Sequence, residues 1–125
     1  MMNCIKSICM LFFQAINLKK IHFNEKLFEI EYQAFTACSS LEEIIIPDSV
    51  EKIGDSAFGY CKKLKKITIP ISIRTLGQYL FYECRNNLIV YIKDEYRDKL
   101  PWPEISFYIN VDGTMCRIAY LESED

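Results

Sequence analysis

Histidine, glycine and proline are scarce in this chain of 125 residues, which contains one His, four Gly and four Pro. No Gly-, Ser- or Pro-rich tract separates two parts of the chain, so we expect one domain with one core over residues 1–125. The sequence also lacks a phosphate-binding Gly loop, a serine nucleophile turn and a metal-binding helix. We therefore expect no catalytic residues, no cofactor and no metal site.

An excess of either charge is also missing, since 15 Lys and Arg balance 17 Asp and Glu. The balanced charge gives no strong positive potential that would attract nucleic acid or acidic lipid, so neither is predicted as a partner. No apolar run approaches the roughly 20 residues of a membrane-spanning helix. The stretch from Ile8 to Ala15 is similar to a signal-peptide core, but Gln14 interrupts it and no clean cleavage site follows.

A 23-residue period runs through the middle of the chain. Ala34 to Cys38 recur in type at residues 57–61 and 80–84, and Phe12 lies 23 residues before Phe35. Leu41, Ile44, Ile46 and Pro47 recur as Leu64, Ile67, Ile69 and Pro70, and a degraded copy precedes them at Leu18, Ile21 and Phe23. A fixed period of this length predicts a solenoid, and solenoids are mostly binding scaffolds.

Each period contains a strand, a turn and a return leg. The segment from Leu41 to Ile46 is rich in apolar residues and is interpreted as a short strand with alternate side chains pointing inward. A turn follows at 47–49, where Pro removes a backbone donor. The return leg, residues 50–61, is broken by Gly54, so a short helix or 3₁₀ turn is expected, with Phe58 and Cys61 facing inward.

The segment from Leu41 to Cys61, with the sequence LEEIIIPDSVEKIGDSAFGYC, resembles the BspA-like class of leucine-rich repeats, and the resemblance covers residues 11–93. It implies an α/β solenoid: a short leucine-rich-repeat array with a parallel sheet on one face and short helical turns opposite. The resemblance also implies protein binding, with adhesion or host interaction for secreted or surface members. The chain shows no convincing export signal or anchor, so its location stays open.

The regular array is expected to end after the third full unit. One residue more separates Cys84 from Leu88 than separates Cys61 from Leu64, which predicts a slip in strand register. Val90 and Ile92 then return to the 23-residue phase of the preceding strand. Residues 94–104 are interpreted as a helical cap, with Trp102 covering the last open layer of the core. Such a cap is common in the family that the sequence resembles. Residues 105–121 alternate in polarity around Asp112-Gly113, which predicts a terminal β-hairpin.

Three cysteines, Cys38, Cys61 and Cys84, are one repeat apart and therefore form a ladder along the solenoid. Stacked coils lie about 4.8 Å apart, within the range of a disulfide. Their Cβ vectors are parallel, however, so we expect buried reduced thiols. The other cysteines have neither this period nor the pair spacing of a zinc site.

Outward positions of the strands form the predicted protein- or peptide-binding face. Lysine pairs at 19–20 and 65–66 flank a glutamate pair at 42–43, an alternation that suits either a self-complementary solvated face or a charged binding strip. The predicted face consists of Lys20, His22, Glu43, Ile45, Lys66, Thr68 and Tyr91. The alternative is an assembly piece, or a fragment of a longer array, that acts through its ends and self-associates at its N-terminal edge.

Overall fold

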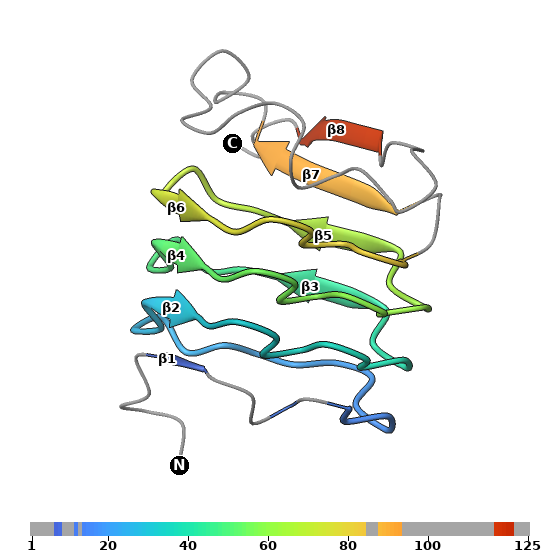
Figure 1. Ribbon diagram of the computed structural model, residues 1–125. Coiled ribbons are helices and arrows are strands. Elements are labelled where there is room, and N and C mark those ends of the chain that lie inside the picture. The colour runs from blue at the N-terminus through green and yellow to red at the C-terminus, as the bar shows by residue number, and fades with distance from the viewer. Residues whose placement is uncertain (1–6, 9–11, 13, 85–87, 94–116, 122–125) are drawn as a thin grey trace.

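The computed structural model describes residues 7–8, 12, 14–84, 88–93 and 117–121. The chain winds in coils that stack on one another (Figure 1), and we call residues 12–34, 35–57 and 58–80 the first, second and third coils. One parallel sheet consists of β1 (Ser7–Ile8), β2 (Glu29–Ile30), β4 (Lys52–Ile53) and β6 (Thr75–Leu76). The other parallel sheet consists of β3 (Glu43–Ile45), β5 (Lys66–Thr68), β7 (Ile89–Lys93) and β8 (Arg117–Leu121).

The second sheet keeps the 23-residue register throughout. Ile44 lies opposite Ile67, and Ile67 lies opposite Val90. The expected return of Val90 to the 23-residue phase is confirmed, and the slip expected after Cys84 does not extend into β7. Six residues separate Cys84 from Val90, as six separate Cys61 from Ile67, so only the buried leucine has moved by one place, to Leu88.

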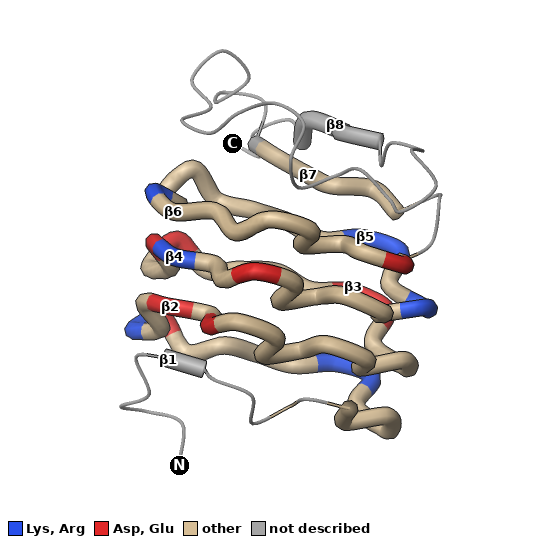
Figure 2. The backbone as a smooth tube through the Cα atoms, viewed as in Figure 1, with Lys and Arg blue, Asp and Glu red and all other residues tan. Residues whose placement is uncertain are grey.

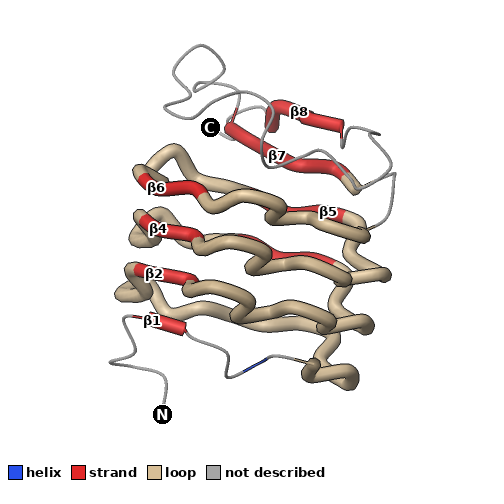
Figure 3. The backbone as a smooth tube through the Cα atoms, viewed as in Figure 1, coloured by secondary structure: helices blue, strands red, loops and turns tan. Residues whose placement is uncertain are grey.

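The return leg also differs from expectation, because no residue between 14 and 84 is helical. The side opposite β3, β5 and β7 holds the other parallel sheet, and loops and tight turns join the two (Figure 3). At these turns the backbone bonds to the next coil: Gln33 N donates to Asp55 O at 3.1 Å, and Ala37 N to Gly59 O at 2.8 Å. Because neighbouring coils satisfy these N–H groups, the short helical turns that we expected are not needed.

Left-handed residues form two ladders at these turns. Seven non-glycine residues have φ between 55° and 63°, one repeat apart, namely Gln14, Ala37, Tyr60 and Glu83 in one ladder and Gln33, Ser56 and Tyr79 in the other. A left-handed residue with a side chain costs about 1–2 kcal/mol. Hydrogen bonds to the next coil offset this cost; Tyr60 N, for example, donates to Tyr82 O at 2.7 Å.

A stack of phenylalanine rings runs through the core. Ring centroids of Phe12, Phe35, Phe58 and Phe81 follow one another at 5.1, 5.7 and 6.2 Å, with interplanar angles of 7°, 9° and 21°. The last three rings are fully buried. The inward strand residues Ile44, Ile67 and Val90 are buried beside this stack. The predicted stacking of the repeats is confirmed.

The C-terminal expectations are tested only in part. The helical cap at 94–104, including Trp102, and the first strand of the hairpin, residues 105–111, lie outside the described residues. β8 lies within the second strand expected for the hairpin. It pairs in parallel with β7, from Ile89 opposite Arg117 to Lys93 opposite Leu121, and this pairing was not predicted. No helix in the described part of the chain is long and apolar enough to cross a membrane.

Candidate functional site

The outer face of the β3–β5–β7 sheet carries the predicted binding residues. Along β3 the middle residue, Ile44, is buried, whereas Glu43 and Ile45 on either side of it are exposed. Ile45 is 61% exposed. Lys20, His22 and Lys66 are also exposed, while Thr68 and Tyr91, which lie opposite each other in the ladder, are half-buried.

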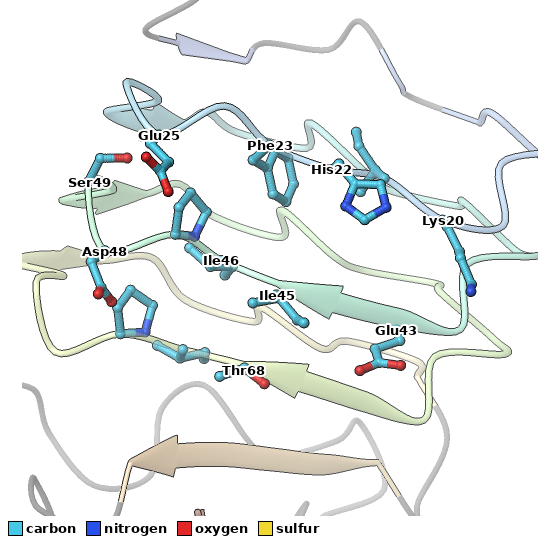
Figure 4. Close-up of a pocket in the computed structure, with 14 residues that line it drawn as sticks. Lys20, His22, Phe23, Glu25, Glu43, Ile45, Ile46, Asp48, Ser49 and Thr68 are labelled. Carbon is cyan, nitrogen blue, oxygen red and sulfur yellow. The ribbon is translucent and has the colours of Figure 1, made fainter. Parts of the chain in front are cut away.

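This face contains an open hollow of about 740 Å³ (Figure 4). Side chains from the first three coils line it: Lys20, Ile21, His22, Phe23 and Glu25; Glu43, Ile45, Ile46, Pro47, Asp48 and Ser49; and Thr68, Ile69 and Pro70. The structure thus brings together five of the seven predicted residues. Lys66 and Tyr91 belong to the same sheet but do not line the hollow.

The middle of the hollow is apolar. Ile45 projects into it, and Pro47 and Pro70 lie one repeat apart at the ends of their strands. A proline has no N–H to satisfy, so a strand can end there without leaving an unpaired donor. The hollow therefore offers a hydrophobic surface that another chain can cover.

The two ends of the hollow differ in charge. At one end Lys20 and Glu43, of opposite sign, lie one repeat apart, and at the other end Glu25 and Asp48, of the same sign, do so. Figure 4 shows these pairs on opposite sides of Ile45. Sequence reasoning missed the acidic end because it treated residues 47–49 only as a turn, although the 23-residue spacing from Glu25 to Asp48 was visible.

Charge alternation from coil to coil is present elsewhere on this face, beside β3 and β5 (Figure 2). Lys65 Nζ lies 3.4 Å from Glu42 Oε1, as expected for a self-complementary ladder. Lys62 pairs with Glu83 and Arg74 with Glu51, each at 3.3 Å. The acidic end of the hollow departs from this rule.

A buried hydroxyl lies at the acidic end. Ser49 Oγ is shielded from solvent and has no hydrogen-bond partner among the described residues. Its counterpart one repeat later, Ser72, donates from Oγ to Val50 O at 2.7 Å. Ser49 is therefore the one described serine hydroxyl that is both buried and unsatisfied, and Figure 4 shows it on the same side of Ile45 as Glu25.

The three ladder thiols are free and buried, as predicted. Each donates to the carbonyl of a phenylalanine in the preceding coil: Cys38 to Phe12 at 3.0 Å, Cys61 to Phe35 at 3.2 Å, and Cys84 to Phe58 at 3.1 Å. Burial raises the pKa of Cys38. A hydrogen bond with the Cys84 thiol, together with burial, raises the pKa of Cys61. These thiols tie the coils together and do not reach the hollow.

The architecture described so far is that of a repeat solenoid with a parallel sheet on each side. A family model described as BspA type leucine rich repeat region matches residues 2–98 in six copies. The chain therefore belongs to the BspA-type leucine-rich-repeat family, whose members are generally non-catalytic scaffolds for protein interaction.

A solved structure supports this assignment. The chain is similar to a leucine-rich repeat protein from Bacteroides ovatus, with a TM-score of 0.70 and 26% sequence identity. The match covers 91% of this chain but only 28% of that one, so the chain spans less than a third of its length. No curated protein matches the chain.

Proposed function

We propose that this domain is a non-catalytic scaffold that binds a protein or peptide through the outer face of the β3–β5–β7 sheet. The proposal rests on the predicted positions Lys20, His22, Glu43, Ile45, Lys66, Thr68 and Tyr91. The observation that carries it is Ile45, an isoleucine that is 61% exposed at the centre of a hollow. An exposed apolar group rimmed by polar residues is typical of an interaction site.

The chemistry of the hollow favours binding over catalysis. One of its hydroxyls, Ser49 Oγ, has no hydrogen-bond partner among the described residues, so no base is in place there to activate it as a nucleophile. Binding needs only shape and complementary groups, which the hollow offers. For an exported form of the chain, such binding would serve adhesion or host interaction.

The size of the face favours a peptide. Four strands at about 4.8 Å spacing place the outer strands only about 15 Å apart. A stable protein interface usually buries roughly 800 Å² per partner. We therefore expect weak binding of a folded protein by this domain alone, and better binding of a short extended peptide.

The test uses a library of random 12-residue peptides displayed on phage, selected against the immobilised chain. Ile45→Asp should weaken binding of a selected peptide by at least about tenfold, since a charge replaces the apolar contact at the centre of the hollow. Ile16→Asp is the matched control, because Ile16 is 58% exposed and does not line the hollow. Circular dichroism and thermal unfolding check that both variants fold. Failure to select any peptide, or equal binding by both variants, would overturn the proposal.

A second candidate is an assembly piece that acts through its ends. The observation that favours it is that β1 and β6 are the outer strands of their sheet within the described residues. An outer strand presents backbone groups with which another chain can pair. Sedimentation velocity over a hundredfold range of concentration tests this role, and a constant monomer would count against it.

A further inference from the structure

We infer that the peptide bound by this face is basic, with an apolar side chain over Ile45 and a lysine or arginine at the acidic end formed by Glu25 and Asp48. This inference rests on the proposed function and adds the chemical class of the ligand. Three observations carry it: the shape of the hollow, the arrangement of its charges and the unsatisfied hydroxyl of Ser49.

The shape of the hollow sets the direction and length of the peptide. From Glu43 to Asp48 is five residues, or about 16 Å at about 3.3 Å per residue, whereas the three coils across it span only about 10 Å. An extended peptide of about five residues therefore fits along the strands. Asp48 is three residues beyond Ile45, so the basic side chain should follow the apolar one by two to four residues.

The charges set the sign of the ligand. In each ion pair among the described residues, a carboxylate faces a cation of a neighbouring coil, as Glu42 faces Lys65. At the acidic end, Glu25 and Asp48 occupy the same position in adjacent coils with the same sign. Like charges stacked in this way repel each other. A guanidinium or ammonium group between them replaces the repulsion with two attractions, and arginine can bind in the bidentate manner.

The opposite end of the hollow does not favour an acidic peptide. There Lys20 and Glu43 lie one repeat apart, so the two charges cancel as seen by a ligand. The hollow is lined by one lysine against Glu25, Glu43 and Asp48, which leaves a formal excess of two negative charges. A basic peptide is therefore attracted, and an acidic peptide is repelled.

Ser49 is the third observation. Its buried Oγ has no partner, although the equivalent hydroxyl of Ser72 has one. In Figure 4 the Ser49 oxygen points toward the side of the hollow where Glu25 lies. Rotation of the Ser49 side chain about χ1 would turn this oxygen toward the hollow, where a cationic N–H group held by the carboxylates is the donor that it lacks.

The same selected peptides test the inference. We expect an apolar residue followed within two to four positions by Lys or Arg. The double variant Glu25→Gln with Asp48→Asn should bind such a peptide about tenfold more weakly in fluorescence anisotropy at low salt. It should also lose most of the salt dependence of binding, because the screened attraction is gone.

Two control variants show whether weaker binding comes from the loss of Glu25 and Asp48 themselves or from a general change in the net charge or folding of the domain. Glu29→Gln with Glu31→Gln removes two negative charges at the other sheet and should leave binding within about twofold. Lys63→Met removes a positive charge from an exposed side chain that does not line the hollow, and it should also leave binding within about twofold. Selected peptides without a basic residue, or unchanged binding by the Glu25–Asp48 variant, would overturn this inference while leaving the proposed function intact. Selection of no peptide would overturn both.

Discussion

The first and second coils carry the same pattern but are not equally buried. Leu18, Ile21 and Phe23 are half-buried, whereas their counterparts Leu41, Ile44 and Ile46 are at most 3% exposed. The backbone follows the same trend: Glu42 N donates to Lys19 O at 3.4 Å, and Lys65 N to Glu42 O at 2.9 Å. Burial in a solenoid thus depends on the neighbouring coil as much as on the residue itself.

The largest loss of stability is expected from substitutions in the phenylalanine stack. Phe58 is fully buried between Phe35 and Phe81, so Phe58→Ala should lower the free energy of unfolding by about 3–5 kcal/mol. Phe12 is half-buried, so Phe12→Ala should cost only about 1–2 kcal/mol. Urea unfolding followed by circular dichroism measures both. Equal losses would contradict the difference between the coils.

A smaller effect is expected where backbones of adjacent coils approach closely. A Cβ at Gly54 would lie 2.5 Å from Tyr32 N and 2.8 Å from Glu31 C, and Gly54 N is tied to Ile30 O at 2.7 Å. Gly54→Ala should therefore cost about 2–3 kcal/mol through overpacking.

Gly59 is the matched control for this contact. Its Cβ would meet its nearest atom, Ser56 O, at 3.5 Å, an ordinary contact distance. Gly59→Ala should change the free energy of unfolding by no more than about 0.5 kcal/mol in the same urea titration. A Gly54→Ala variant as stable as Gly59→Ala would show that the first and second coils can separate without cost.

Much of this fold could be predicted because the 23-residue period places the same residue types on top of one another. The inward leucines, isoleucines and phenylalanines follow directly from it. The sheet of β2 and β4 could not be predicted, since two-residue strands carry no alternation to detect. The left-handed turns were equally hidden, because Ser56 and Tyr60 occupy positions where a sequence signal would be glycine.

The candidate site was predictable where strand alternation decides which side chains face outward. Glu43 and Ile45 on β3 follow that rule. Glu25 and Asp48 lie beyond the strands, in segments whose side-chain directions depend on turn geometry. Their approach to the same hollow required the coordinates.

The alkylation rates of the buried thiols offer a kinetic measure of the difference between the first and second coils. Cys38 bonds to the first coil through Phe12 O, and Cys61 bonds to the second through Phe35 O. Local opening of the weaker first coil should expose Cys38 first. Alkylation under native conditions, followed by mass spectrometry of peptides, should label Cys38 faster than Cys61. Faster labelling of Cys61 would mean that the chain opens from the other end.

The thiols also predict sensitivity to alkali. The pKa of Cys61 is raised in the folded state, so the thiol stays protonated there while the unfolded chain ionises near pH 8.5. The stabilisation is complete below about pH 8.5 and is lost as the pH rises toward the folded pKa. The free energy of unfolding should therefore fall more steeply between pH 8.5 and 9.5 than in a Cys61→Ala variant. Identical slopes would exclude this thiol as the cause.

The smallest loss of stability is expected from the alternating charges of Lys19, Glu42 and Lys65 on successive coils. Glu42 pairs with Lys65 of the third coil at 3.4 Å, and the described residues include no ion pair of Glu42 with Lys19 of the first coil. The two paired side chains are 56% and 51% exposed, so solvent screens them and Lys65→Met should cost only about 0.2–1 kcal/mol. Lys19→Met should cost less, because its coil lies farther from the Glu42 backbone. Double-mutant cycles with Glu42→Gln, run in low salt and in 1 M NaCl, isolate each coupling. A coupling for Lys19 as large as that for Lys65 would mean that the first coil is held as firmly as the third.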